Sequence, residues 1–147
     1  MANWCGNYIT FKGGDIATLR KEFKKCIETN DKGFGWIPEG LSEDNKHIFY
    51  FDFRGDTEIN DELCASFSSK WYPPIEALVS LADTFCCSFE LMYEELGCLV
   101  YGRRTYDRGV MMMAELDDSE LELVGDDEDH DFDRLNSLLM NKQLTIA

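Results

Sequence analysis

The sequence is poor in the residues on which most metal and catalytic sites depend. It contains only two histidines, His47 and His130, and neither is spaced from a cysteine in the way that zinc ligands are. No two of its six cysteines form a C-x-x-C pair, and no histidine is placed as the base for a cysteine nucleophile. We therefore expect no metal, no cofactor and no enzymatic activity.

Long apolar runs are also absent. No run approaches the roughly 18 residues that a membrane-spanning helix needs, and the opening stretch MANWCGNYIT lacks the basic and then apolar layout of a signal peptide. We therefore expect the protein to stay in the cytoplasm. Thiols are kept reduced there, so the sequence predicts buried, unpaired cysteines at positions 5, 26, 64, 86, 87 and 98.

Basic residues are scarce as well. The chain has 14 lysines and arginines against 29 acidic residues, which gives a net charge of −15. The excess is uneven, because residues 115–147 carry 11 acidic and two basic side chains, a net charge of −9. A surface of this sign repels the phosphates of DNA and RNA. We expect it to attract a basic protein surface instead.

The residues that are present indicate a folded domain. Hydrophobic residues make up 44% of the 147 residues and aromatic residues 13%, which is enough for one core. Alternation of apolar and polar residues predicts a first strand over residues 4–12, and an apolar stripe from Ile16 to Ile27 predicts a helix. Phe49, Phe51 and Phe53 share one face of a strand predicted over residues 46–54.

A second stretch of the chain repeats this order of elements. Alternation over residues 63–67 predicts a strand, and Pro73 and Pro74 end it and begin a helix that reaches Phe85. Asp107-Arg108-Gly109 is typical of a turn. Further antiparallel strands are predicted over residues 87–93, after Gly97, and over residues 110–116.

The order β, α, β, β, α, β predicts an α+β fold, a ferredoxin-like sandwich with both helices on one face of an antiparallel sheet that a C-terminal hairpin extends. We assign residues 1–116 to this domain and residues 117–147 to an acidic C-terminal extension. Alternation of Glu120 and Glu122 with Leu121 and Leu123 predicts a short edge strand over residues 119–124. Helical spacing of apolar residues predicts a final helix over residues 129–142.

Three phrases in the sequence resemble a known family. They are NWCGN at residues 3–7, KWYPP at residues 70–74 and YEELG at residues 93–97. Together they resemble the YubB-type ferredoxin-like domain of small proteins carried by bacteria, plasmids and phages. The resemblance implies the same fold, a phage or mobile-element origin and the cytoplasm of a bacterial host. It implies no activity and no catalytic residue.

The acidic extension is the first candidate site. Carboxylates spaced along a surface mimic phosphates, so they can occupy the groove of a nucleic-acid-binding protein. This hypothesis predicts a non-enzymatic protein that binds and inhibits a basic host protein, such as a nucleic-acid-binding defence factor. The simpler interpretation is an acidic run that keeps the chain soluble. The residues assigned to partner binding are Glu115, Asp117, Asp118, Glu120, Glu122, Asp126, Asp127, Glu128, Asp129, Asp131 and Asp133.

An aromatic and arginine-rich set is the alternative candidate. Aromatic rings stack on bases and guanidinium groups hold phosphates, so these side chains predict a small-molecule or nucleotide-binding surface. Ordinary surface charge beside a strand-end aromatic is the simpler interpretation. The residues of this set are Trp71, Tyr72, Tyr93, Arg103, Arg104 and Arg108.

Overall fold

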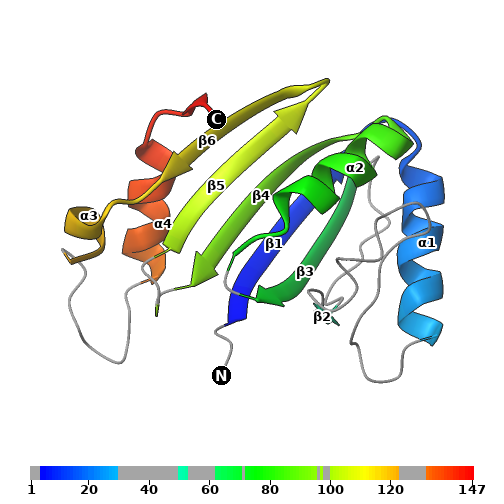
Figure 1. Cartoon of the computed structure of the whole chain (residues 1–147), viewed down its shortest axis with the longest axis horizontal. Helices are drawn as coiled ribbons and strands as arrows, with labels where there is room; N and C mark the ends of the chain where they lie inside the picture. Colours follow the sequence, from blue (N-terminus) through cyan, green and yellow to red (C-terminus); the bar gives the residue numbers. More distant parts are fainter. Residues whose placement is uncertain are drawn as a thin grey trace.

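The structure is a computed structural model that describes residues 4–29, 50–52, 62–70, 72–95, 97, 100–122 and 132–147 (Figure 1). Strands and helices alternate along the chain. Their bounds are β1 Trp4–Lys12, α1 Ile16–Thr29, β2 Tyr50–Asp52, β3 Glu62–Lys70, α2 Ile75–Phe85, β4 Ser88–Glu95, β5 Val100–Asp107, β6 Val110–Glu115, α3 Asp118–Glu122, α4 Phe132–Asn141 and β7 Thr145–Ile146.

The described strands form one antiparallel sheet. Its order is β2-β3-β1-β4-β5-β6-β7, so β1 lies between β3 and β4 although it comes first in the chain. The succession from β1 to β4 with α1 and α2 is the predicted βαββαβ unit. The hairpin of β5 and β6 continues the sheet beyond β4, as the sequence predicts, and β7 adds an edge strand that the sequence pattern does not predict.

Side-chain alternation gives the sheet two different faces. We call the side that α1 and α2 cover the core face. Ile9 on β1 lies opposite Ala65 on β3 and Leu91 on β4, and all three are buried there. The side chains of α1 and α2 that pack with them include Ile16, Leu19, Leu78, Leu81 and Ala82.

The opposite side, which we call the open face, is covered at one end only. Tyr101 on β5 and Ala114 on β6 form a second core there with Leu121 on α3 and with Leu135 and Leu139 on α4. Figure 1 shows α4 beside β5 and β6, away from α1 and α2. The extension therefore packs onto the sheet, and the part of the open face over β1, β3 and β4 is left without a helix in the described part of the chain.

The predicted edge strand over residues 119–124 is wrong, because residues 118–122 form the helix α3. Asp117 Oδ1 accepts a 2.9 Å hydrogen bond from the Glu120 amide, and Glu120 Oε1 accepts a 3.2 Å bond from the Asp117 amide. This reciprocal pair is a capping box, which favours a helix start over an extended chain. Leu121 then packs into the second core, so its burial supports the helix.

Other predicted segments are described only in part. α4 lies within the helix predicted over residues 129–142, and β2 lies within the strand predicted over residues 46–54. Residues 46–49, 53–54, 123–124 and 129–131 of these predictions lie outside the described residues.

The cysteine prediction is correct for two residues and wrong for two others. Cys5 and Cys87 are buried free thiols, whereas Cys64 and Cys86 are free but exposed. Cys64 alternates with the inward-facing Leu63 and Ala65, so it points to the open face. Cys86 takes a left-handed conformation (φ 55°) at the end of α2. The side chains of Cys26 and Cys98 lie outside the described residues.

Candidate interaction surface

The structure divides the acidic residues assigned to partner binding into groups with different roles. Glu115 accepts a 2.5 Å hydrogen bond from Tyr93 on the core face, and Asp117 caps α3. Glu120 also pairs with Lys142 at 2.5 Å, which ties α3 to the end of α4. These three carboxylates make intramolecular contacts that stabilise the fold. Exposed carboxylates remain at Asp118, Glu122 and Asp133, and residues 126–129 and 131 lie outside the described residues.

Asp117 is held ionised by its cap geometry. Hydrogen bonds from the Ser119 hydroxyl and from the Glu120 amide lower its pKa below the ordinary aspartate value. Because it is exposed as well as ionised, it adds to the negative charge around α3. The capping role and the surface charge are therefore compatible at this residue.

Basic side chains near the extension are used to hold α4. Arg103 donates from Nε to the Leu139 carbonyl at 3.2 Å and from a terminal nitrogen to the Lys142 carbonyl at 3.0 Å. A guanidinium at the carbonyl end of a helix satisfies groups that have no partner within the helix and complements the helix dipole. Arg103 and Lys142 thus make intramolecular contacts.

The aromatic and arginine-rich set is not brought onto one surface. Tyr93 and Arg104 lie on the core face, where Tyr93 is buried, and Arg103 lies on the open face under α4. Tyr72 is 61% exposed beside β3, while Arg108 is exposed in the β5–β6 turn at the other end of the sheet. Trp71 lies outside the described residues. The described members of this set therefore do not form the predicted ligand surface.

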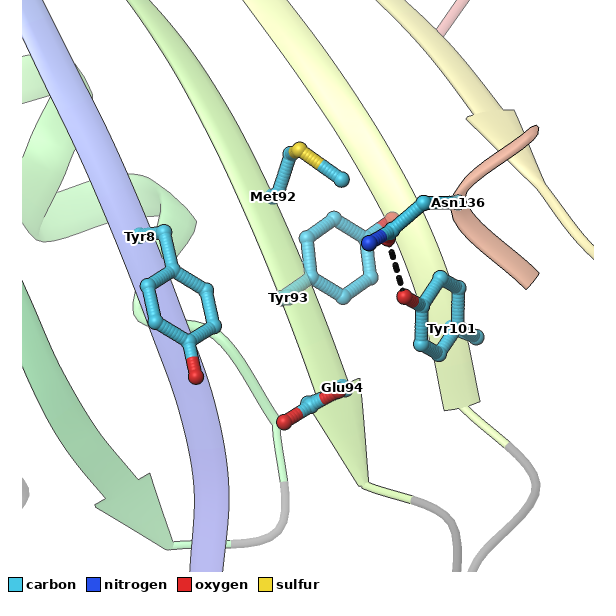
Figure 2. Close-up of a pocket in the computed structure, with 6 residues that line it drawn as sticks. All are labelled: Tyr8, Met92, Tyr93, Glu94, Tyr101 and Asn136. Atoms are coloured by element: carbon cyan, nitrogen blue, oxygen red, sulfur yellow. Dashed lines mark hydrogen bonds between the residues drawn. The ribbon is translucent and has the colours of Figure 1, made fainter. Parts of the chain in front are cut away.

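A pocket on the open face brings together residues that the sequence analysis did not group. It has a volume of about 370 Å³ and lies where β1, β4 and β5 pass beside α4 (Figure 2). Tyr8 lies across from Met92 in the β1–β4 register, and Glu94 lies across from Tyr101 in the β4–β5 register. Figure 2 shows these side chains with Asn136 of α4 around one hollow. The residues that line it are Tyr8, Met92, Tyr93, Glu94, Tyr101 and Asn136.

The carboxylate of Glu94 leans toward β1 above Gly6. Gly6 and Glu94 are register partners, and a Cβ built at Gly6 would lie 3.4 Å from Glu94 Cγ and 3.6 Å from Glu94 Oε1. The carboxylate therefore lies over β1 on the same face as Tyr8. Tyr101 is held from the other side, because its hydroxyl donates a hydrogen bond to Asn136 Oδ1.

The pocket has a negative electrostatic character. Burial raises the pKa of Glu94, and no hydrogen-bond or ion-pair partner of this carboxylate is present among the described residues. Burial, and then the charge of Glu94, raises the pKa of Tyr8. Burial followed by the charges of Glu94 and Tyr8 raises the pKa of Tyr101 to about 12. Both phenols therefore stay neutral, and the charge of Glu94 contributes to the raised pKa of each.

The open face continues from the pocket along β1 and β4. Tyr8 and Met92 also border a second hollow of about 490 Å³, which reaches Cys64 and Glu90. Lys12 lies beside Glu90, with its Nζ 3.4 Å from Glu90 Oε1 and 3.9 Å from Glu62 Oε1, so two carboxylates share its charge. The described open face thus combines exposed aromatic and sulfur atoms with acidic side chains.

The three phrases behind the family resemblance meet at one end of the sheet. Asn7 donates from Nδ2 to Ser69 Oγ at 2.9 Å, and Ser69 in turn donates to the Tyr72 carbonyl at 2.6 Å. Glu95 accepts a 3.0 Å bond from the Gly97 amide. Asn7, Ser69 and Glu95 are all buried. Asn7 and Ser69 tie β1 to β3, and Glu95 fixes the chain that follows β4, so these polar residues have a structural role.

The described part of the chain shows neither a metal site nor a membrane-spanning helix. Within it, no group of three or more histidine, cysteine, aspartate or glutamate side chains is arranged to hold a metal ion. None of its helices is both long and apolar enough to cross a membrane.

Comparison with known proteins identifies a family. A family model described as the ferredoxin-like domain in Api92-like protein matches residues 49–135, which is more than half of the chain. The match runs from β2 into α4, so it continues past residue 116, where the sequence analysis placed the end of the domain. Neither a curated protein nor a solved structure matches the chain. The more specific YubB-type assignment stays a prediction.

Proposed function

We propose that this chain, which belongs to the family of ferredoxin-like domains in Api92-like protein, is an interaction protein that binds a basic partner protein and catalyses no reaction. The observation that carries the proposal is the arrangement of acids on one side of the sheet. The exposed carboxylates of α3 and α4 and the Glu94 pocket lie on the open-face side, and Asn136 of α4 lines that pocket. Asp133 lies one helical turn before Asn136.

Electrostatic physics supports a basic partner. A net charge of −15 on 147 residues attracts a cationic surface over distances up to the Debye length, about 8 Å at physiological ionic strength. Complementary charge mainly raises the association rate and selects the partner, while buried contacts at the centre of an interface determine how long the complex lasts. The exposed Tyr8 and the half-buried Met92 are suited to such central contacts.

A nucleic-acid-binding protein is the kind of basic partner that the acidic extension fits. The carboxylates of α3 and α4 match the charges of a nucleic-acid strand in sign and density only. We expect this match to be enough for the protein to compete with nucleic acid for a basic groove. We favour a nucleic-acid-binding host protein, inhibited by occlusion of its groove in the course of host defence against a phage or mobile element. This form accounts for an acidic extension in a chain that itself repels nucleic acid.

Capture from bacterial lysate with a matched pair of variants tests the proposal. In the first variant the exposed acids of the extension are neutralised as Asp118→Asn, Glu122→Gln and Asp133→Asn. In the control variant three acids elsewhere are neutralised as Glu22→Gln, Glu76→Gln and Asp107→Asn, which keeps the change in net charge the same. Both variants and the unchanged chain are compared at low and at high salt.

We expect the unchanged chain and the control to retain one or a few basic proteins that high salt releases, and the extension variant to lose them. Equal loss of capture in the two variants would show that total charge rather than the extension matters. Full capture by both variants, or capture of no protein at low salt, would contradict the proposal. Thermal shift with nucleotides tests the alternative separately, and we expect no shift, because Arg103 and Arg104 lie on opposite faces of the sheet.

A further inference from the structure

The pocket on the open face combines features that recognise one particular cationic group. Tyr8 on β1 and Tyr101 on β5 come from strands on either side of β4 and lie diagonally across it, because Tyr8 is opposite Met92 and Tyr101 is opposite Glu94. Glu94 on β4 supplies the negative charge between them. Met92 adds a polarizable side chain beside the tyrosines. The hollow is open to solvent at Tyr8, which is 54% exposed.

We propose that this pocket takes an arginine side chain of the basic partner, with its guanidinium group against the ring of Tyr8 and paired with the carboxylate of Glu94. The inference rests on the proposed function, since it names the group that the partner inserts. A flat guanidinium stacks on an aromatic face and donates two parallel hydrogen bonds to one carboxylate. The pocket offers both partners side by side.

Other ligand classes fit the pocket less well. A phosphate or carboxylate is repelled by Glu94. A neutral base stacked on Tyr8 would leave the half-buried carboxylate without a partner, which costs binding free energy. A lysine ammonium satisfies the charge but presents no flat surface to the ring and no forked donor pair to the carboxylate. Arginine is therefore the side chain that uses every feature of the site.

Asn136 has a supporting role in this arrangement. It accepts the hydrogen bond from the Tyr101 hydroxyl, so α4 determines how the Tyr101 ring stands beside Glu94. Tyr101 is 4% exposed and acts as a fixed wall, whereas the ring of Tyr8 is free to cover the incoming group. The pocket is thus complete only when α4 is packed on the sheet.

A titration with small probes tests the inference without the partner. The probes are a capped glycine–arginine–glycine peptide, the same peptide with citrulline, which is neutral but equal in shape, and the same peptide with lysine. Binding to the full chain is followed by amide chemical shifts at constant ionic strength. We expect the arginine peptide to shift the amides of Tyr8, Glu94 and Tyr101, and to bind about tenfold more tightly than the citrulline peptide.

Variants on β4 and β1 sharpen the test. Glu94→Gln should weaken the arginine peptide about tenfold and remove its advantage over citrulline, and Tyr8→Leu should weaken it about threefold. Glu90→Gln is the matched control, because Glu90 is exposed on the same face four residues before Glu94 in β4 and does not line this pocket. It should leave the affinity unchanged.

Three outcomes would overturn the inference: equal binding of the arginine and citrulline peptides, equal binding of the arginine and lysine peptides, or shifts confined to α3 and α4. Its failure is distinguishable from failure of the proposed function. If the peptides miss the pocket while basic proteins are still captured through the extension, only the arginine assignment is wrong. If the arginine peptide binds as expected and no basic protein is captured, the pocket stands and the proposed partner does not.

Discussion

Tyr93 on β4 donates a 2.5 Å hydrogen bond to Glu115 on β6, and the bond passes over Gly102 on the strand between them. The three residues are register partners across β4, β5 and β6. A Cβ at position 102 would lie 2.5 Å from Tyr93 Oη and 2.7 Å from Glu115 Cγ, closer than atoms can approach. The absence of a side chain at Gly102 is therefore a condition for this bond.

Gly102→Ala should lower the free energy of unfolding by about 1–3 kcal/mol, because the tyrosine ring and Glu115 must move to admit the methyl group. Urea denaturation measures the change. Gly6→Ala is the control, since its Cβ would meet nothing closer than Glu94 Cγ at 3.4 Å, an ordinary contact. Equal losses in the two variants would show that the contact at Gly102 is not the cause.

Arg103→Ala should loosen α4 without unfolding the rest of the sheet. The change removes the hydrogen bonds to the carbonyls of Leu139 and Lys142, each worth about 1.5–3 kcal/mol when the donor is charged and the site is dry, and less where water competes. Hydrogen exchange should speed up in α4 while β1 and β4 stay protected. Arg108→Ala, at the exposed β5–β6 turn, should change neither region.

Alkaline pH should destabilise the protein in part through Cys5. Burial raises the pKa of this thiol from 9.0 to about 12. Between these values the unfolded chain releases the proton and the folded chain retains it, so the free energy of unfolding falls as the pH rises from about 9 to about 12. Cys5→Ala should reduce this slope, whereas Cys64→Ala, at an exposed thiol, should leave it unchanged. Equal slopes in all three proteins would contradict the assignment.

Alkylation of the folded protein should separate the thiols by exposure. Cys64 and Cys86 are exposed and should react within the first labelling period, while Cys5 and Cys87 are buried and should react only after unfolding. Burial also raises the pKa of Cys87, which lowers its thiolate fraction further. Peptide mass spectrometry distinguishes the four sites. Early labelling at Cys5 would show that this thiol on β1 is not buried in solution.

The sequence by itself determined the secondary elements of the main unit and which face most of their residues occupy. The alternation in β1 and β3 and the apolar stripes of α1 and α2 are local patterns, so each can be recognised without knowing its neighbours. The proline pair before α2 and the Asp107-Arg108-Gly109 turn mark boundaries for the same reason. The βαββαβ order follows from these elements, and the ferredoxin-like family match agrees with it.

Only the tertiary structure decided which acidic residues are available to a partner. Whether Glu115 faces solvent or bonds to Tyr93 depends on β4 and β6 pairing with opposite edges of β5, which brings together side chains 22 residues apart on one face. The local alternation around Leu121 predicts a strand, whereas the capping box and the burial of Leu121 in the second core select α3. The pocket joins Tyr8, Glu94 and Asn136 across three elements that are distant in the chain. Side chains can act as one site only when packing brings them together, and that packing is a long-range property.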